Sequence, residues 1–353
     1  MQLDFAKSSG LQIKSGAPTT PQRILTDNSH AVTDEPEHEL HGTNETTALD
    51  RDVDQGSSAS VGILNGFGRT LGDSIIGLQA LSVAVRIRAI PAPATLFRLP
   101  YLPTMVQAIY EAAEFVRIKT LPWHFATKER HFDHHGSYAR VIDLRNYAFD
   151  LDFQRTSMID FFFRRLGVPS SSISTADKRN AWLSPRVVSA EPLFPSGYIL
   201  VCPNSSTPLR NMPPAVHELI LQEALAVGPV VTQGQVPDKL CNRVIRALPC
   251  KTLGDLCGLV RHAKLIISTD TAMVHLADAF DVPCLAFFPT HLPKWRVRDY
   301  PNCRAVMLRS ELPPGLEFAR VSGDEELAQA GWFSDNGDLG WLTDVLKPSL
   351  EAT

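Results

Sequence analysis

The stretch 264–289, KLIISTDTAMVHLADAFDVPCLAFFP, decides the fold class of this chain. Its two apolar runs, residues 265–268 and 284–288, have the length and composition of buried strands. A short helical segment lies between them, so the stretch predicts a strand–helix–strand unit with parallel strands. In open α/β sheets, ligands bind where the carboxyl end of such a strand meets the next helix. The stretch therefore predicts an α/β fold and contains a candidate ligand site.

Three polar residues fall at that position: Asp270, Thr271 and His275. A helix N-terminus favours anionic groups such as phosphate, because its backbone N–H groups and its dipole place positive charge there. A carboxylate, a hydroxyl and an imidazole beside that helix end indicate a site for a phosphate-bearing ligand. On these residues alone, an ordinary unit in which Asp270 or Thr271 caps the helix is equally consistent with the sequence.

The composition is that of a globular protein of ordinary polarity. The 353 residues are 44% hydrophobic and 20% charged, and the net charge of −4 gives no basic field for nucleic acid or an anionic membrane. The six cysteines form no C-x-x-C pair, which favours free thiols in a reducing compartment over disulfides or a zinc site. The sequence shows neither an apolar run of transmembrane length nor a signal peptide at its start. These features predict a cytoplasmic protein.

The first 60 residues differ from the rest of the chain. They hold ten acidic and four basic residues and a single aromatic residue, Phe5. Such a segment buries too little apolar surface to offset its ordering entropy, so we expect residues 1–60 to be a disordered tail. The acidic run at residues 50–54, DRDVD, is interpreted as solvated tail charge, not as a metal site.

Strand and helix patterns alternate through the remainder of the chain. This alternation predicts two Rossmann-like, doubly wound domains with a cleft between them, at residues 61–180 and 197–335, followed by a C-terminal helix or tail at 336–353. Residues 181–196, rich in Pro and Ser, are the expected linker. The other expected strands are residues 61–64, 94–99, 116–121, 140–144, 198–202 and 229–232, and the expected helices are 74–86, 102–115, 157–166, 214–225 and 252–262.

Several weak motifs occur in one order along these domains. They are the turn Leu71-Gly72-Asp73, the strand VIDL at 141–144, the hydroxyl-rich loop SSTPLRNMP at 205–213, the helix start Lys251-Thr252-Leu253 and the run DTAMVH at 270–275. In this order they resemble glycosyltransferase family 9, the heptosyltransferase-like enzymes of the GT-B fold, over residues 61–301. Where the family has Gly, Lys, Trp and Gly, this sequence has Ala272, Arg210, Met212 and Phe288.

The resemblance implies a role for each motif residue. It implies that Asp73 is the catalytic base and that Asp270 holds hydroxyl groups of the donor. The leaving diphosphate is then expected to meet Ser205, Ser206, Arg210, His275 and the helix that starts near Thr271 and Ala272, with Gln235 and Lys251 gripping the base or sugar. The alternatives are that Asp73 only caps a helix beginning at Ser74, and that Arg210 is a solvated surface charge. All these roles require the Gly72-Asp73 turn and the Asp270–His275 turn to face each other.

The resemblance implies an inverting, metal-independent transfer of a sugar, with ADP-heptose and lipopolysaccharide core as the default pair. No cofactor is expected beyond the nucleotide-sugar donor, and the acceptor is a glycolipid, a polysaccharide or a protein. The expected location is the bacterial cytoplasm, with at most peripheral contact at the inner face of the inner membrane. The cluster HFDHH at 131–135 lacks evident partner ligands for a metal. The alternatives are a degenerate protein that only binds nucleotide sugars, and a nucleotide-sugar hydrolase or epimerase.

Overall fold

The computed structural model describes residues 60–122, 138–187, 194–309 and 322–352. The chain divides into two units, residues 1–53 and 54–353, and all of the described residues belong to the second. The predicted disordered tail, its DRDVD run and the HFDHH cluster at 131–135 lie outside the described residues. Those three interpretations therefore stay predictions.

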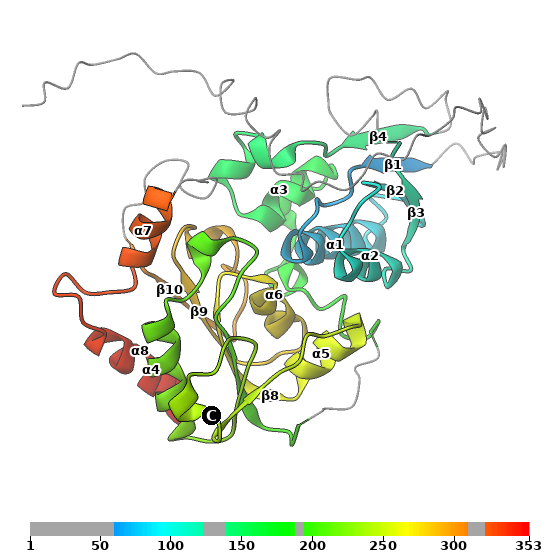
Figure 1. Ribbon diagram of the computed structural model, residues 1–353. Coiled ribbons are helices and arrows are strands. Elements are labelled where there is room, and N and C mark those ends of the chain that lie inside the picture. Colours follow the sequence, from blue (N-terminus) through cyan, green and yellow to red (C-terminus); the bar gives the residue numbers. More distant parts are fainter. Residues whose placement is uncertain (1–59, 123–137, 188–193, 310–321, 353) are drawn as a thin grey trace, which may run out of the picture. The chain divides into compact units, whose positions relative to one another are not determined.

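The first half of the described unit is built on a parallel four-stranded sheet with the order β3-β2-β1-β4 (Figure 1). Its strands are β1 (Val61–Leu64), β2 (Ala94–Arg98), β3 (Val116–Thr120) and β4 (Arg140–Asp143). In the sheet, Ile63 pairs with Leu96 on one side and with Ile142 on the other. Its helices are α1 (Leu71–Arg86), α2 (Thr104–Glu111) and α3 (Met158–Arg165).

The second half is built on a parallel six-stranded sheet with the order β10-β9-β8-β5-β6-β7. Its strands are β5 (Tyr198–Cys202), β6 (Val230–Thr232), β7 (Val244–Arg246), β8 (Ala263–Thr269), β9 (Cys284–Phe288) and β10 (Cys303–Met307). The chain moves outward from β5 to β7 and then returns to β8 on the other side of β5. That reversal makes the sheet doubly wound and creates a switch point between β5 and β8, where ligands bind in such sheets.

The helices of the second half are α4 (Pro214–Leu225), α5 (Leu253–Arg261), α6 (Ala272–Ala279), α7 (Ser322–Ala330) and α8 (Gly340–Glu351). The starts of α5 and α6 follow local capping rules. Thr252 and Asp255 form a reciprocal capping box on α5, and the Thr271 hydroxyl accepts the Met273 N–H at the start of α6. None of the helices in the described ranges is long and apolar enough to span a bilayer.

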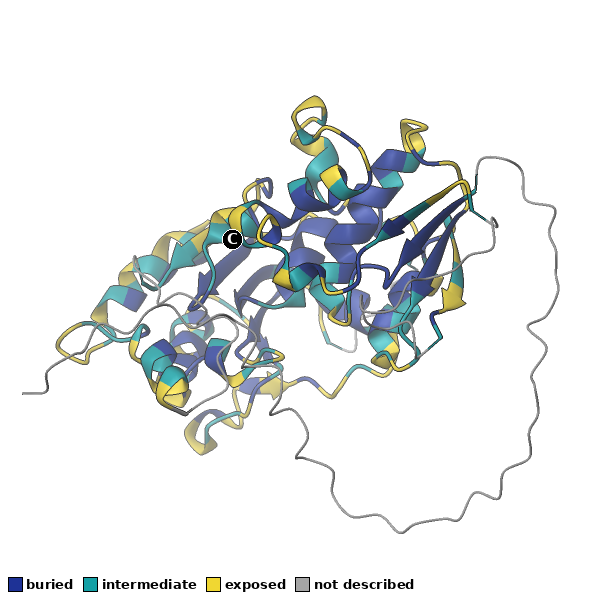
Figure 2. Ribbon diagram, turned by 90° about the horizontal axis from the view of Figure 1, so that it is seen from above, coloured by how far each residue is buried: buried dark blue, intermediate teal, exposed yellow. Residues whose placement is uncertain are grey.

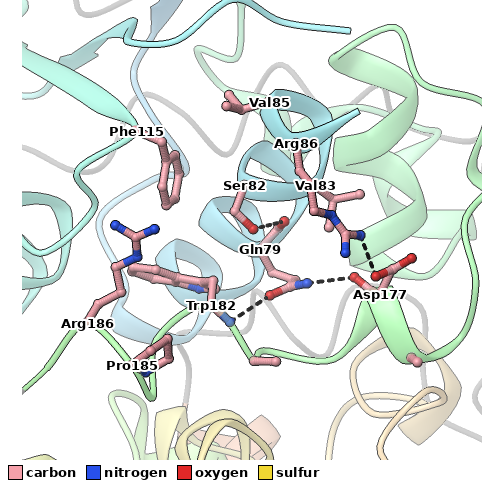
Figure 3. Close-up of a pocket in the computed structure, with 12 residues that line it drawn as sticks. Gln79, Ser82, Val83, Val85, Arg86, Phe115, Asp177, Trp182, Pro185 and Arg186 are labelled. Carbon is pink, nitrogen blue, oxygen red and sulfur yellow. Dashed lines mark hydrogen bonds and ion pairs between the residues drawn. The ribbon is translucent and has the colours of Figure 1, made fainter. Parts of the chain in front are cut away.

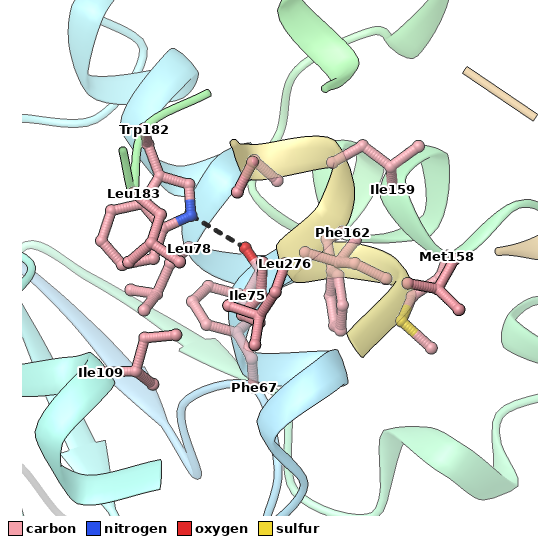
Figure 4. Packing of buried hydrophobic residues seen from close by; sticks show 14 of the residues in the cluster. Phe67, Ile75, Leu78, Ile109, Met158, Ile159, Phe162, Trp182, Leu183 and Leu276 are labelled. Atoms are coloured by element: carbon pink, nitrogen blue, oxygen red, sulfur yellow. Dashed lines mark hydrogen bonds between the residues drawn. The ribbon is translucent and has the colours of Figure 1, made fainter. Parts of the chain in front are cut away.

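One apolar cluster joins the two halves. Phe67, Ile75 and Phe162 of the first half and Leu276 of α6 belong to the same group of buried side chains (Figure 4). Most of the strands are buried as well, as Figure 2 shows in dark blue. Because a continuous apolar interface resists relative motion, α1 and α6 are held against each other. These two helices carry the two turns that the sequence singled out.

Three expectations about the elements are wrong in detail. The first helix begins at Leu71 instead of Ser74, because Thr70 has an extended backbone and its hydroxyl accepts the Asp73 N–H. The helix expected at 102–115 is shorter, spanning only α2. The expected linker is partly packed: Trp182 is buried, and its indole N–H donates to the Ile75 carbonyl at 3.0 Å.

Candidate active site

The glycine-rich turn after β1 is shaped by aromatic side chains beneath it. Gly68 has φ +90°, and a Cβ there would come within 2.5 Å of the Tyr147 hydroxyl oxygen. Tyr110 supports the same turn, since its hydroxyl oxygen accepts the Phe67 N–H at 3.0 Å. Glycine is therefore required at position 68 both by the backbone and by the space. The tight turn brings the start of α1 directly over Tyr147.

Asp73 lies in the first turn of α1 and does not cap it. The Tyr147 hydroxyl donates a hydrogen bond to Asp73 Oδ2 at 2.6 Å. Burial and the negative charge of Asp73 raise the pKa of Tyr147 well above its usual value, so the phenol keeps its proton and remains a donor. Among the described residues, the other carboxylate oxygen, Oδ1, accepts no hydrogen bond. Asp73 is thus held in place through one oxygen, and the other stays available to a ligand.

Asp270 lies at the switch point, just after β8, and is only 3% exposed. Arg210 Nη1 donates to its Oδ2 at 3.1 Å, and His291 Nδ1 lies 2.9 Å from the same oxygen. Burial by itself would raise the pKa of Asp270, but the positive charge of Arg210 and the hydrogen bond from His291 outweigh it and hold the pKa well below its usual range. Asp270 is therefore an ionised, buried carboxylate.

The hydroxyl-rich loop after β5 is held by bonds within itself. The Ser205 hydroxyl donates to the Thr207 carbonyl at 2.6 Å, and the Ser205 N–H donates to Asn211 Oδ1 at 2.7 Å. Arg210 Nη2 donates to the Ser206 hydroxyl oxygen at 3.0 Å. The alternative that Arg210 is a solvated surface charge is therefore wrong. Its guanidinium binds Asp270 and Ser206, so most of its positive charge is balanced by the Asp270 carboxylate within the protein.

His275 lies on α6 and is 4% exposed, with its Nδ1 2.9 Å from the Tyr300 hydroxyl oxygen. Burial lowers the pKa of His275 to about 4, so the imidazole is neutral at neutral pH. Its opposite edge faces the first half of the chain. A Cβ on Gly72 would lie 2.9 Å from His275 Cδ2 and 3.3 Å from Nε2.

The tautomer of His275 follows from the partners of Tyr300. Asp278 accepts hydrogen bonds from the Asn180 backbone N–H at 2.7 Å and from Arg179 Nε at 3.0 Å, so it acts as an acceptor. The Asn180 amide must then turn its NH2 group toward Asp278, at 3.1 Å, and the same nitrogen donates to the Tyr300 oxygen at 2.7 Å. Because the Tyr300 oxygen accepts this hydrogen bond, its own hydroxyl proton is donated to His275 Nδ1. His275 therefore carries its own proton on Nε2, on the edge that faces Gly72.

The two turns on which the sequence interpretation depends lie in contact. Besides touching His275, a Cβ on Gly72 would lie 3.7 Å from the Ala272 Cα. Only a glycine at position 72 lets α1 approach α6 this closely. The structure thus brings Asp73, Thr271, Ala272 and His275 to one place and links Ser206 and Arg210 to it through Asp270. Gln235 and Lys251 are exposed, and their side chains make no bond to this group in the described part of the chain.

Two further residues of this site had no motif in the sequence: Tyr147 and His291. Tyr147 follows β4, which pairs with β1, and His291 follows β9, which pairs with β8. Since parallel strands end at the same edge of a sheet, the loop after each strand lies beside the loop after its neighbour. A correct prediction of which strands are adjacent would have placed Tyr147 and His291 at the site. Arg296, in the same loop as His291, stacks over Phe153 of the first half.

A cavity of about 420 Å³ lies elsewhere, along the second half of α1 (Figure 3). Gln79 bridges its walls, donating to the Asp177 carbonyl at 2.6 Å and accepting the Trp182 N–H at 3.2 Å. None of the residues at the Asp73–Asp270 site lines it. Within the described residues, no group of three or more His, Cys, Asp or Glu side chains is placed to hold a metal ion.

Comparisons with known proteins agree with this geometry. Residues 232–322 match the model of glycosyltransferase family 9 (heptosyltransferase). The fold is similar to that of the bacterial iron-containing dodecameric glycosyltransferase TibC from enterotoxigenic E. coli, with a TM-score of 0.55 and 14% identity over 83% of this chain and 79% of TibC. It is also similar to E. coli ADP-heptose lps heptosyltransferase II, with a TM-score of 0.52 and 11% identity over 83% of this chain and 99% of the other. No curated protein matches the sequence.

The family match covers the β8–α6–β9 unit and its neighbours, which hold Asp270, Thr271 and His275. The fold match extends over the first half as well, where Asp73 lies. The resemblance drawn from the sequence and the GT-B architecture are therefore confirmed. Residues 232–322 match the glycosyltransferase family 9 model, and the described chain has a fold similar to that of the heptosyltransferases.

Proposed function

We propose that the protein transfers a sugar, heptose by default, from a nucleoside diphosphate sugar to a hydroxyl group, with inversion and without a metal ion. The observation that carries the proposal is the contact between Gly72 and His275, which sets a carboxylate of one half against the buried Asp270–Arg210 pair of the other. TibC has been determined with ADP-D-beta-D-heptose, and ADP-heptose is the donor named for heptosyltransferase II. ADP-heptose is therefore the default donor.

Asp73 is the proposed base. In an inverting transfer the acceptor oxygen attacks the sugar from the side opposite the leaving diphosphate, and a carboxylate takes its proton. Tyr147 holds Asp73 through Oδ2, which leaves Oδ1 to accept the hydrogen bond of the incoming hydroxyl. The Tyr147 hydroxyl keeps its proton, so it remains a hydrogen-bond donor to Asp73.

The second half is the proposed donor side. The start of α6 offers backbone N–H groups and a positive dipole end to the diphosphate, and His275 offers its Nε2–H. Arg210 keeps Asp270 ionised and places the Ser206 loop. We propose that Asp270 Oδ1 accepts a hydroxyl of the donor sugar or ribose, and that Ser205, Gln235 and Lys251 lie along the remainder of the donor.

The proposed acceptor is a glycolipid such as lipopolysaccharide core, with a polysaccharide or a protein as the other acceptor classes. Enzyme action on such a glycolipid would place the protein in the cytoplasm, with at most peripheral contact at the inner face of the inner membrane. TibC is described as containing iron, so independence from metal needs its own test. Activity that is unchanged after treatment with a chelator would support the metal-free mechanism.

The test is release of nucleotide from ADP-heptose and from UDP-sugars, with and without lipopolysaccharide core acceptor. Release that requires the acceptor supports transfer, release without it supports a hydrolase, and binding without release supports a degenerate binding protein. Asp73→Asn should abolish most turnover while donor affinity is retained. Full turnover in Asp73→Asn would show that the base has been misassigned.

A further inference from the structure

Arg296 is presented to the site by an anchored loop. Its backbone N–H donates to the Pro293 carbonyl at 2.9 Å, and Val297 and Tyr300, which follow it, are buried. The Tyr300 hydroxyl is fixed by His275, so the loop cannot shift without disturbing α6. The position of Arg296 is therefore set by the same network that orients His275.

The Arg296 side chain crosses to the first half of the chain. Its guanidinium carbon lies 5.6 Å from the centroid of the Phe153 ring. The Phe153 ring in turn packs edge-on against Tyr147, with centroids 5.0 Å apart. The guanidinium therefore lies beside the residue that holds Asp73. A guanidinium that lies over an aromatic ring keeps its N–H groups pointing outward in its own plane, where they can bind oxygen ligands.

The charge of Arg296 reaches both halves of the site. Burial and Asp73 raise the pKa of Tyr147, and the charge of Arg296 opposes that rise; the same charge adds to the lowering of the pKa values of Asp270, His275 and His291. These groups surround the contact between the two turns. Arg296 is thus a positive charge near these groups, in agreement with its contact with Phe153.

Arg296 also differs from the other arginines nearby. Arg210 is paired with Asp270, and Arg298 is paired with Asp160 and Asp299. Within the described residues, the Arg296 side chain makes no ion pair and no hydrogen bond. The five N–H donors of this half-buried guanidinium therefore have no acceptor among the described residues. An unpaired cation in this setting is suited to an anionic ligand.

We propose that Arg296 binds the phosphate group nearest the transferred sugar, the β-phosphate of a nucleoside diphosphate donor, while Phe153 holds its guanidinium in place. This inference rests on the proposed function and assigns the leaving-group cation to Arg296, since Arg210 is committed to Asp270. Because the Arg296 guanidinium lies near Tyr147, which holds the proposed base, we assign it the β-phosphate, the phosphate bonded to the transferred sugar. Bond cleavage takes place between the sugar and the β-phosphate, and Asp73 must lie on the far side of the same sugar.

The test is isothermal titration of ADP and UDP, with AMP and UMP as ligands that lack the β-phosphate. Arg296→Ala should weaken diphosphate binding by at least about 10-fold and change monophosphate binding by less than about 3-fold, as expected for a lost charge-assisted contact to one phosphate. Arg296→Lys should recover part of the loss, because it keeps the charge without the planar fork.

Arg261 offers a matched control. Its guanidinium stacks over Phe280 at 6.0 Å, at the end of α5, and Arg261→Ala should leave the affinity for both nucleotide classes unchanged. Unchanged diphosphate affinity in Arg296→Ala, or an equal loss for monophosphates, would overturn the inference and leave the proposed function standing. If the unaltered protein binds no nucleoside diphosphate, both the inference and the proposed function fall.

Discussion

Replacing Gly72 by alanine tests the contact on which the proposed site depends. The new methyl carbon would lie 2.9 Å from His275 Cδ2, a distance that cannot be kept without a shift. His275 has little freedom to move, because it is buried and Tyr300 holds its far edge. The two helices α1 and α6 must therefore separate slightly, against the apolar cluster that joins the two halves.

The size of the effect can be worked out from two opposing contributions. Overpacking of a fitted contact costs about 1–3 kcal/mol in the free energy of unfolding. Alanine is favoured over glycine within a helix by about 1 kcal/mol, and Gly72 is the second residue of α1. The net change for Gly72→Ala is then a destabilisation of up to about 2 kcal/mol. Turnover should fall as well, because the separation moves Asp73 away from the donor side.

Gly323→Ala is the matched control for this variant. Gly323 is the second residue of α7, and a Cβ there meets nothing within 4 Å, so this variant keeps the helix gain without the clash. Thermal unfolding should place Gly72→Ala below Gly323→Ala by about 2–6 °C. Equal melting temperatures and equal turnover in the two variants would show that the two turns do not touch.

Other changes probe single contacts of the site. Tyr147→Phe removes the hydrogen bond to Asp73, and turnover should fall about 10-fold or more with nucleotide affinity retained, as steady-state kinetics and titration would show; unchanged turnover would deny Tyr147 this role. Asp270→Asn leaves Arg210 without its carboxylate, and urea unfolding should report a loss of about 3 kcal/mol; a loss below about 1 kcal/mol would contradict it. Burial lowers the pKa of His217 from 6.5 to about 4. Between these two pH values the unfolded chain binds more protons than the folded protein, so the free energy of unfolding should decrease as the pH is lowered from about 6.5 to about 4. His217→Gln should make that decrease smaller, and an unchanged pH dependence of the free energy of unfolding would refute the assignment.

In the six-stranded sheet the central strands could be predicted from the sequence, and the two edge strands could not. The bounds of β5 and β9 agree with the predicted strands residue for residue, because all of their side chains are buried and apolar. The edge strands β7 and β10 were missed, since most of their side chains are not buried and form no apolar run. The start of α1 was misplaced for a different reason. Its Gly72 resembles a turn residue, although it serves close helix packing.

The candidate site was predictable only where one segment carries several of its residues. Asp270, Thr271 and His275 are neighbours in the sequence, so a single strand–helix junction predicts their grouping. Tyr147 and Arg296 lie in loops outside the motifs, and their places depend on which strands are adjacent and on how the two halves pack. Contacts between halves, such as that of Arg296 with Phe153, leave no periodic pattern in a sequence.

The parallel order of the strands explains why a single contact between the halves brings together all the side chains of the candidate site. In each sheet the carboxyl ends of the parallel strands share one edge, so the loops after β1 and β4 come together on one side and those after β5, β8 and β9 on the other. One close approach, Gly72 against His275, is then enough to bring both sets of loops together. The halves also divide the charge. A carboxylate held by a neutral tyrosine belongs to the first half, and the buried Asp270–Arg210 pair belongs to the second. A transfer that needs a base on one face of a sugar and cations on the opposite face requires that separation.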